Sequence, residues 1–146
     1  MRVLPWLLMV LGMALVASAC GGGGMPTAGQ EESVPVERLG PGAIAVAQRD
    51  YAFDVQDLRV SAGHVEFRVT NRGSGPHELF VVPRDGGRFG SPVAESDAQD
   101  PGASSGLRVK LGPGNYSLVC LLVATPREGP VSHMELGMRL DFEVSS

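Results

Sequence analysis

Four residues of this chain carry side chains that bind soft metal ions, namely His77, Cys120, His133 and Met138. Together they offer two imidazole nitrogens, one thiolate and one thioether. Cysteine and methionine sulfur favour Cu(I), and imidazole suits copper in both oxidation states. A weak axial thioether leaves the ion close to three-coordinate, so its charge can change with little rearrangement. The donor set predicts one mononuclear copper ion that passes single electrons.

Each of these residues would also fit an ordinary structural role. A histidine beside a proline turn can bond to the backbone. A lone cysteine is often a small buried apolar residue, and a methionine at the start of an alternating strand often belongs to the core. The order of the four residues, with four positions between His133 and Met138, favours a metal site. The remaining histidine, His64, is expected to be a turn or strand-edge residue.

Residues 1–19 are typical of a lipoprotein signal peptide. Arg2 precedes an apolar stretch over residues 3–16, which is shorter than the roughly 20 residues that a membrane-spanning helix needs. Small residues stand directly before Cys20, so we expect cleavage there after lipidation of the Cys20 thiol. Several acyl chains would then anchor the protein to the cell membrane on its extracytoplasmic side. Ordinary secretion with a free Cys20 is the alternative.

The number of cysteines also favours metal binding by Cys120. The chain has two cysteines, and lipidation of Cys20 would leave Cys120 alone in an exported, oxidising compartment without a partner for an internal disulfide. Such a thiol is either buried and inert, paired with another chain, or bound to metal. The histidine and methionine that follow Cys120 favour metal binding.

Composition fits one small acidic domain. The formal net charge is -4, and removal of residues 1–19 with their single basic residue would bring it to about -5, which makes nucleic acid an improbable partner. The length suffices for one domain with a two-layer core plus a tether. We expect a monomer.

Residues 20–42 are predicted to be a flexible linker that begins with the lipidated Cys20. Four consecutive glycines are followed by mostly polar residues up to position 33, a composition with little to bury and high backbone freedom. Prolines at positions 35 and 41 should carry the chain onward without regular structure.

Residues 43–146 are predicted to form an all-β domain, a Greek-key β-sandwich. Residues 83–106, rich in Gly, Pro, Ser and Asp, are expected to form a long excursion with one helical turn around residues 93–99. Residues 124–132 contain prolines and a glycine and should form a loop. Strands are expected at short alternating or continuous apolar runs, over residues 43–47, 55–60, 65–69, 77–82, 107–111, 116–123 and 138–144.

The domain resembles a cupredoxin, the small blue-copper fold of plastocyanin, azurin and their relatives. The similarity covers roughly residues 43–145. It rests on the turn that leads into His77 (71–77), the strand that leads into the cysteine (114–120), and the spacing of His133 and Met138. The resemblance implies that His77, Cys120 and His133 form a trigonal plane around copper. It also implies that Met138 is the long axial ligand.

One feature departs from the family. Twelve residues separate Cys120 from His133, where cupredoxins commonly have only a few. The extra residues could form a flap that docks a partner while the ligands stay in place, or His133 could lie outside the site. The sequence leaves both possibilities open.

Three functions follow as hypotheses. The first is a membrane-tethered carrier that shuttles single electrons between extracytoplasmic redox proteins, some of them in the membrane. The second is a copper-binding lipoprotein for storage, delivery or tolerance, and the third is a metal-free cupredoxin-like interaction domain. An enzyme is not expected, because three histidines and one available thiol are too few for a multicopper oxidase or a binuclear copper centre.

Overall fold

The computed structural model describes residues 28–124, 126 and 129–146. The predicted signal peptide (1–19) and the predicted lipidation at Cys20 lie outside the described residues. Within the described ranges, the structure has no helix long and apolar enough to cross a membrane.

The described chain is built almost entirely of β-strands, which confirms the all-β prediction. A 3-10 helix, η1 (Val36–Arg38), follows the first strand. The strands are β1 (Ala28–Val34), β2 (Ile44–Arg49), β3 (Ala52–Asp54), β4 (Val60–Ser61), β5 (Gly63–Asn71), β6 (His77–Asp85), β7 (Arg88–Phe89), β8 (Ala94–Gln99), β9 (Ser104–Leu111), β10 (Gly114–Val119), β11 (Val123–Ala124), β12 (Val131–Ser132) and β13 (Arg139–Ser145).

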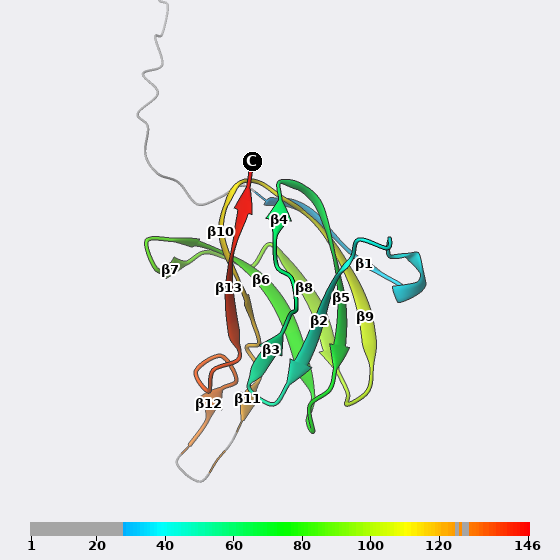
Figure 1. Ribbon diagram of the computed structural model, residues 1–146. Helices are drawn as coiled ribbons and strands as arrows, with labels where there is room; N and C mark the ends of the chain where they lie inside the picture. The colour runs from blue at the N-terminus through cyan, green and yellow to red at the C-terminus, as the bar shows by residue number, and fades with distance from the viewer. Residues whose placement is uncertain (1–27, 125, 127–128) are drawn as a thin grey trace, which may run out of the picture.

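Two sheets form the sandwich (Figure 1). One has the strand order β1-β9-β5-β2-β3, and the other has the order β4-β13-β10-β6-β7 with β8 also paired to β6. Most neighbours are antiparallel, while β2 runs parallel to β5 and β4 parallel to β13. The hairpin of β11 and β12 stands apart as a small third sheet at one end of the sandwich.

The core lies between the sheets, where the alternating strands meet. On β5 the buried positions recur every second residue, and Phe67 from this strand packs edge-on against Phe142 of β13 with ring centroids 6.4 Å apart. Phe142 also stacks on Tyr116, which is fully buried and donates its hydroxyl to the Gly112 carbonyl at 3.1 Å. Burial of each large side chain contributes about 1.5–3 kcal/mol, so this cross-sheet cluster fixes the sandwich that carries the site.

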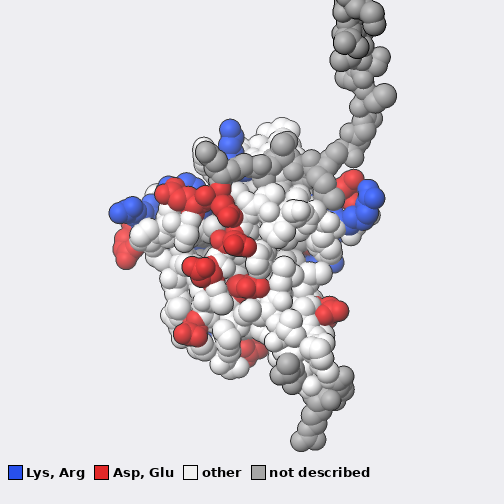
Figure 2. Space-filling model, turned by 180° about the vertical axis from the view of Figure 1, so that it is seen from behind, with Lys and Arg blue, Asp and Glu red and all other residues white. Residues whose placement is uncertain are grey.

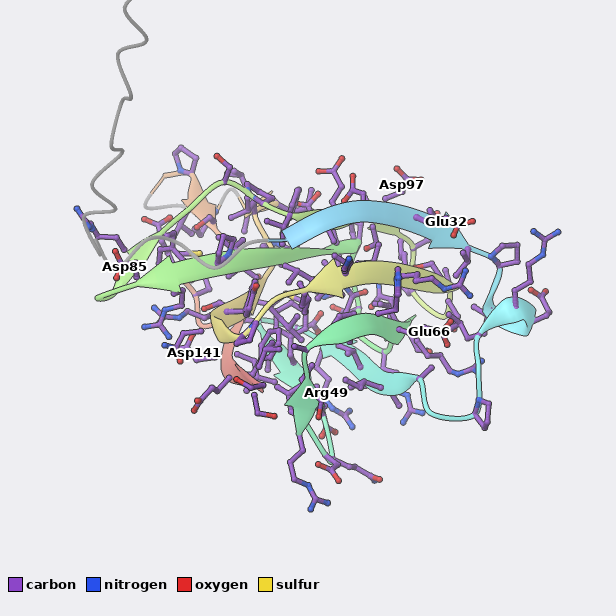
Figure 3. The ribbon with its side chains drawn as sticks, turned by 90° about the horizontal axis from the view of Figure 1, so that it is seen from above. Glu32, Arg49, Glu66, Asp85, Asp97 and Asp141 are labelled. Carbon is purple, nitrogen blue, oxygen red and sulfur yellow. The ribbon has the colours of Figure 1, made fainter. Side chains whose placement is uncertain are left out.

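The linker predicted over residues 20–42 is wrong for residues 28–34, which form strand β1. Strand β1 pairs antiparallel with β9, and Val34 at its end is buried. Arg108 of β9 forms ion pairs with Glu32 and Glu66, the carboxylates labelled on the strands to either side in Figure 3. The apolar pattern of this segment is weak because one edge strand contributes little to the core, so the pairing is set by non-local backbone hydrogen bonds.

The helical turn predicted around residues 93–99 is also wrong, because this segment forms β8 and pairs antiparallel with β6. Ala94, Ser96 and Gln99 are buried, and the Ser96 hydroxyl accepts the Leu79 backbone N–H at 3.0 Å. Strand β6 offers an open edge, and pairing to that edge overrides the weak local preference of the segment. The strand predicted over residues 55–60 is wrong except at its last residue, because only Val60 of this range lies in a strand, the short β4.

Candidate metal centre

The four predicted ligands lie at one end of the sandwich, the end that carries the β11–β12 hairpin (Figure 1). His77 is the first residue of β6 and Cys120 directly follows β10. His133 directly follows β12 and Met138 directly precedes β13. Strands β6, β10 and β13 are neighbours in one sheet, so the sheet gathers segments that are distant in sequence.

Three ligand groups meet at one point. The Nδ1 atoms of His77 and His133 are 3.2 Å apart, and the Cys120 Sγ lies 3.5 Å from the His133 Nδ1. One ligand atom from each of the three side chains falls within 4.8 Å of the others. His77 and Cys120 are buried, whereas His133 is half-buried.

The two separations from the His133 Nδ1 fit a shared metal ion. Nitrogen and sulfur ligands bind zinc, for example, at about 2.0–2.3 Å, and ligands spread around one ion at such bond lengths lie about 3–4 Å from one another. Two imidazoles and one thiolate in a buried site are the donors of trigonal copper sites. The residues present therefore fit a copper ion of the type 1 class.

Met138 is tied to the other ligands through the backbone. It is fully buried, its N–H donates to the His133 carbonyl at 2.8 Å, and its carbonyl accepts the Cys120 N–H at 3.2 Å. Gly137, with φ 114°, adopts the left-handed backbone conformation that lets the chain turn between His133 and Met138. The role of Met138 as an axial ligand stays a prediction.

The long segment between Cys120 and His133 does not remove His133 from the ligand group. Val123 and Ala124 pair with Ser132 and Val131, so the inserted residues leave and return as a hairpin. At its base the His133 N–H donates to the Leu122 carbonyl at 2.7 Å. The hairpin therefore closes the loop beside Cys120 and brings the chain back to the site.

The turn before His77 is organised by Asn71. The buried Asn71 side chain accepts the Gly73 N–H at 2.8 Å and donates to the Gly75 carbonyl at 2.8 Å. Asparagine commonly stabilises such turns by bonding to the backbone two residues ahead. This arrangement fixes where the chain enters β6 and so where His77 begins.

Two residues of the β2–β3 turn, which sequence reasoning missed, contact the histidines. The Asp50 carboxylate lies 3.3 Å from the Nε2 of His77 and accepts the Ser74 N–H at 2.8 Å. This backbone hydrogen bond, with a smaller contribution from His77, lowers the pKa of Asp50. The ring of Tyr51 meets the His133 ring edge-on, with centroids 5.2 Å apart and planes at 86°. No spacing motif links residues 50 and 51 to the ligands, so only the tertiary structure reveals them.

Burial disfavours the charged forms of Cys120 and His133. Desolvation raises the pKa of the Cys120 thiol. Desolvation, together with the nearby His77, lowers the pKa of His133. A metal ion requires the thiolate, so binding would release the Cys120 proton and should weaken as pH falls.

A cleft of about 410 Å³ opens onto the centre between the β2–β3 turn, the turn before His77 and the base of the hairpin. Its lining includes both histidines together with Asp50, Tyr51 and Val123. Large apolar side chains are exposed in the segments that carry the site, namely Tyr51, Leu121, Val123 and Leu136. This end of the molecule is therefore hollowed and partly apolar.

His64 lies elsewhere. It is exposed near the start of β5, paired with Lys110 of β9, whereas the turn that leads to His77 follows the other end of β5. It does not belong to the ligand group found among the described residues.

No protein-family model matches the chain, and no curated protein matches it. Several solved structures are similar to it. The chain is similar to dithionite-reduced auracyanin from the photosynthetic bacterium Roseiflexus castenholzii, with a TM-score of 0.56 and 17% identity over 71% of this chain and 97% of that one. It is also similar to auracyanin A, a blue copper protein of Chloroflexus aurantiacus, with a TM-score of 0.54 and 19% identity over 73% and 100% of the two chains.

These similarities show that the domain has the cupredoxin fold, as its sequence resemblance implied. The ligand group formed by His77, Cys120 and His133 occurs within that fold and is a candidate type 1 copper site.

Proposed function

We propose that this protein is an exported blue-copper electron carrier, with His77, Cys120 and His133 as equatorial ligands and Met138 as axial ligand. The observation that carries the proposal is the convergence of two imidazole nitrogens and one thiol sulfur within 4.8 Å. Copper bound there would supply one-electron exchange between Cu(I) and Cu(II). The auracyanin A structure is described as a blue copper protein, which supports the same assignment.

The chain's own contribution is to hold the ligands still. Cys120 is fixed by its N–H bond to the Met138 carbonyl, and His133 by its N–H bond to the Leu122 carbonyl. His77 is buried at the start of a central strand. Rigid ligands keep the site in one geometry for both charge states, so little reorganisation accompanies electron transfer.

Electrons would enter and leave at the cleft. His133 is half-buried and lines this opening with Tyr51 and Val123. Exposed apolar side chains at a functional end favour contact with a partner surface. We propose that extracytoplasmic or membrane redox proteins dock here, and that the protein acts as a carrier and not as an enzyme.

The remaining surface is acidic on one side. Figure 2 shows acidic side chains gathered on the face seen from behind. Such a field disfavours nucleic acid. A lipid anchor at Cys20, which lies outside the described residues, would keep the carrier near membrane partners and raise their effective concentration.

Spectroscopy of the purified protein after addition of Cu(II) tests the site. We expect an intense visible band from thiolate-to-copper charge transfer and a narrow copper hyperfine splitting in electron paramagnetic resonance spectra. Cys120→Ser should abolish the band while His64→Ala, as control, leaves it intact. A colourless wild-type protein with wide hyperfine splitting would refute the type 1 assignment.

Copper storage or delivery is the second candidate. The cleft favours it, because it is lined by both histidine ligands and the half-buried His133 lies at its opening, where a chelating partner could extract the ion. The two functions differ in rate constants. A carrier should exchange electrons faster than it releases Cu(I) to a competing chelator, whereas a delivery protein should show the reverse order.

A further inference from the structure

We propose that the turn Asp50–Tyr51 between β2 and β3 is an outer clamp that orients both histidine ligands, with Asp50 holding His77 and Tyr51 holding His133. Its consequences for copper rest on the proposed function, while its effect on the imidazoles exists without the metal. The clamp acts from the sheet of β2 and β3, whereas His77 begins β6 of the opposite sheet and His133 follows β12 of the small third sheet.

The Asp50 carboxylate contacts the His77 nitrogen that points away from the metal centre. The Nδ1 of His77 faces His133, while its Nε2 lies 3.3 Å from the Asp50 carboxylate. A carboxylate at Nε2 favours the tautomer that carries its proton there, which leaves the Nδ1 lone pair free for a metal ion. The Ser74 N–H donates to the same Asp50 oxygen at 2.8 Å, so the carboxylate is itself held in place.

The absence of a side chain at Gly73 allows the Asp50 carboxylate to approach the His77 imidazole. A Cβ atom at this position would lie 2.4 Å from the His77 Nε2 and 2.7 Å from the Asp50 Oδ1. Both distances are shorter than nonbonded atoms allow, so a side chain here would separate the carboxylate from the imidazole. A glycine at position 73 is therefore needed for the contact between Asp50 and His77.

Tyr51 adopts a strained backbone to reach the second histidine. Its φ is 63°, in the left-handed region that non-glycine residues seldom occupy. Its ring packs edge-on against His133, and its carbonyl lies 3.4 Å from the position of a Cβ on Gly137 in the ligand loop. Strain of this kind persists where surrounding contacts fix it, often at functional sites. The Tyr51 ring therefore restrains the His133 ring from outside the hairpin that carries it.

A negative charge on the outer side of His77 stabilises the more highly charged ion. Asp50 should therefore favour Cu(II) over Cu(I) and lower the reduction potential. Loss of such an outer carboxylate typically weakens metal affinity about 10- to 100-fold. If Cu(I) affinity stays constant, each tenfold loss of Cu(II) affinity raises the potential by about 59 mV.

The first test uses the copper-free protein and nitrogen-15 NMR of the imidazole rings. We expect His77 to carry its proton on Nε2 in wild type and to lose this preference in Asp50→Ala. An unchanged tautomer in Asp50→Ala, with the fold intact by circular dichroism, would overturn the Asp50 half of the clamp. This readout stands even if the wild-type protein does not form a type 1 site, so failure of the proposed function is detected separately.

The second test measures Cu(II) affinity, Cu(I) affinity and potential in the copper-loaded protein. Asp50→Asn keeps the size of the side chain but removes its charge, and it should lose Cu(II) affinity about 10- to 100-fold with a raised potential. Tyr51→Asn tolerates the left-handed backbone but lacks the ring, and it should alter the hyperfine splitting, whereas Tyr51→Phe should restore the wild-type spectrum. Wild-type affinity and potential in Asp50→Asn, or a wild-type spectrum in Tyr51→Asn, would contradict the clamp.

Discussion

The Nδ1 atoms of His77 and His133 lie 3.2 Å apart, although 56 positions separate the two residues in the chain. His77 begins a central strand, whereas His133 returns to the site from a hairpin. Their rings meet at 63° with centroids 5.1 Å apart. The two imidazoles thus reach one point from structurally different supports, one rigid and one added by the long loop.

Gly73→Ala should damage the site without unfolding the protein. The new Cβ would displace the His77 imidazole or the Asp50 carboxylate, so we expect Cu(II) affinity to fall at least tenfold, the lower end of the range for lost outer contacts. Gly75→Ala is the matched control, because a Cβ there meets no atom within 4 Å. Equal affinities of the two variants in a chelator competition would argue against this packing.

Val123→Asp should slow electron exchange with a redox partner and leave the visible spectrum unchanged. Val123 is 59% exposed at the base of the hairpin and lines the cleft beside His133. A charge at the rim of a docking face mainly lowers the association rate, here by roughly tenfold. Stopped-flow kinetics would measure it, with Phe89→Asp on the distant strand β7 as control. A similar slowing by both variants would show that docking does not use this end.

Protonation of Asp141 in strong acid should lower the stability of the folded protein. Its hydrogen bonds with Arg139 and Ser117 lower its pKa from 3.8 to about 2. The folded state therefore binds fewer protons than the unfolded state between these values, and stability contributed above pH 3.8 is lost as pH falls through about 2. The Asp141 side chain is 42% exposed, so solvent screens its interactions. We therefore expect the ionised carboxylate to contribute about 1 kcal/mol to the free energy of unfolding.

Urea unfolding of wild type and Asp141→Asn at several pH values would measure this contribution. The stability difference should be largest above pH 4 and shrink toward pH 2, in the window set by the two pKa values. A difference that is constant over this range would exclude the ionised carboxylate as its source.

Loss of the packing between β1 and the core should destabilise the domain, and Val34→Ala tests this. Strand β1 covers the edge of β9 and buries Val34. Val34→Ala alone should lower the free energy of unfolding by about 1–2 kcal/mol through lost burial. The exposed Ser33→Ala on the same strand is the control, and an equal effect of both changes would mean that this strand is not packed on the core.

The sequence by itself determined the donor set and the strands that present it. Apolar alternation marked β5 and β9, and an apolar run marked a strand over residues 77–82 that begins at His77. The same patterns placed Cys120 at the end of a strand and Met138 at the start of another. These features were predictable because side-chain period and residue chemistry are local properties of the chain.

Only the tertiary structure decided the surroundings of the ligands and the edges of the sheets. The contacts of Asp50 and Tyr51 with the two histidines, and the pairing of β1 and β8, join segments whose local patterns are weak or misleading. Tertiary structure also returned His133 to the other ligands after twelve intervening residues. Such contacts depend on loop closure and on backbone hydrogen bonds between strands, and neither is encoded in the period of one segment.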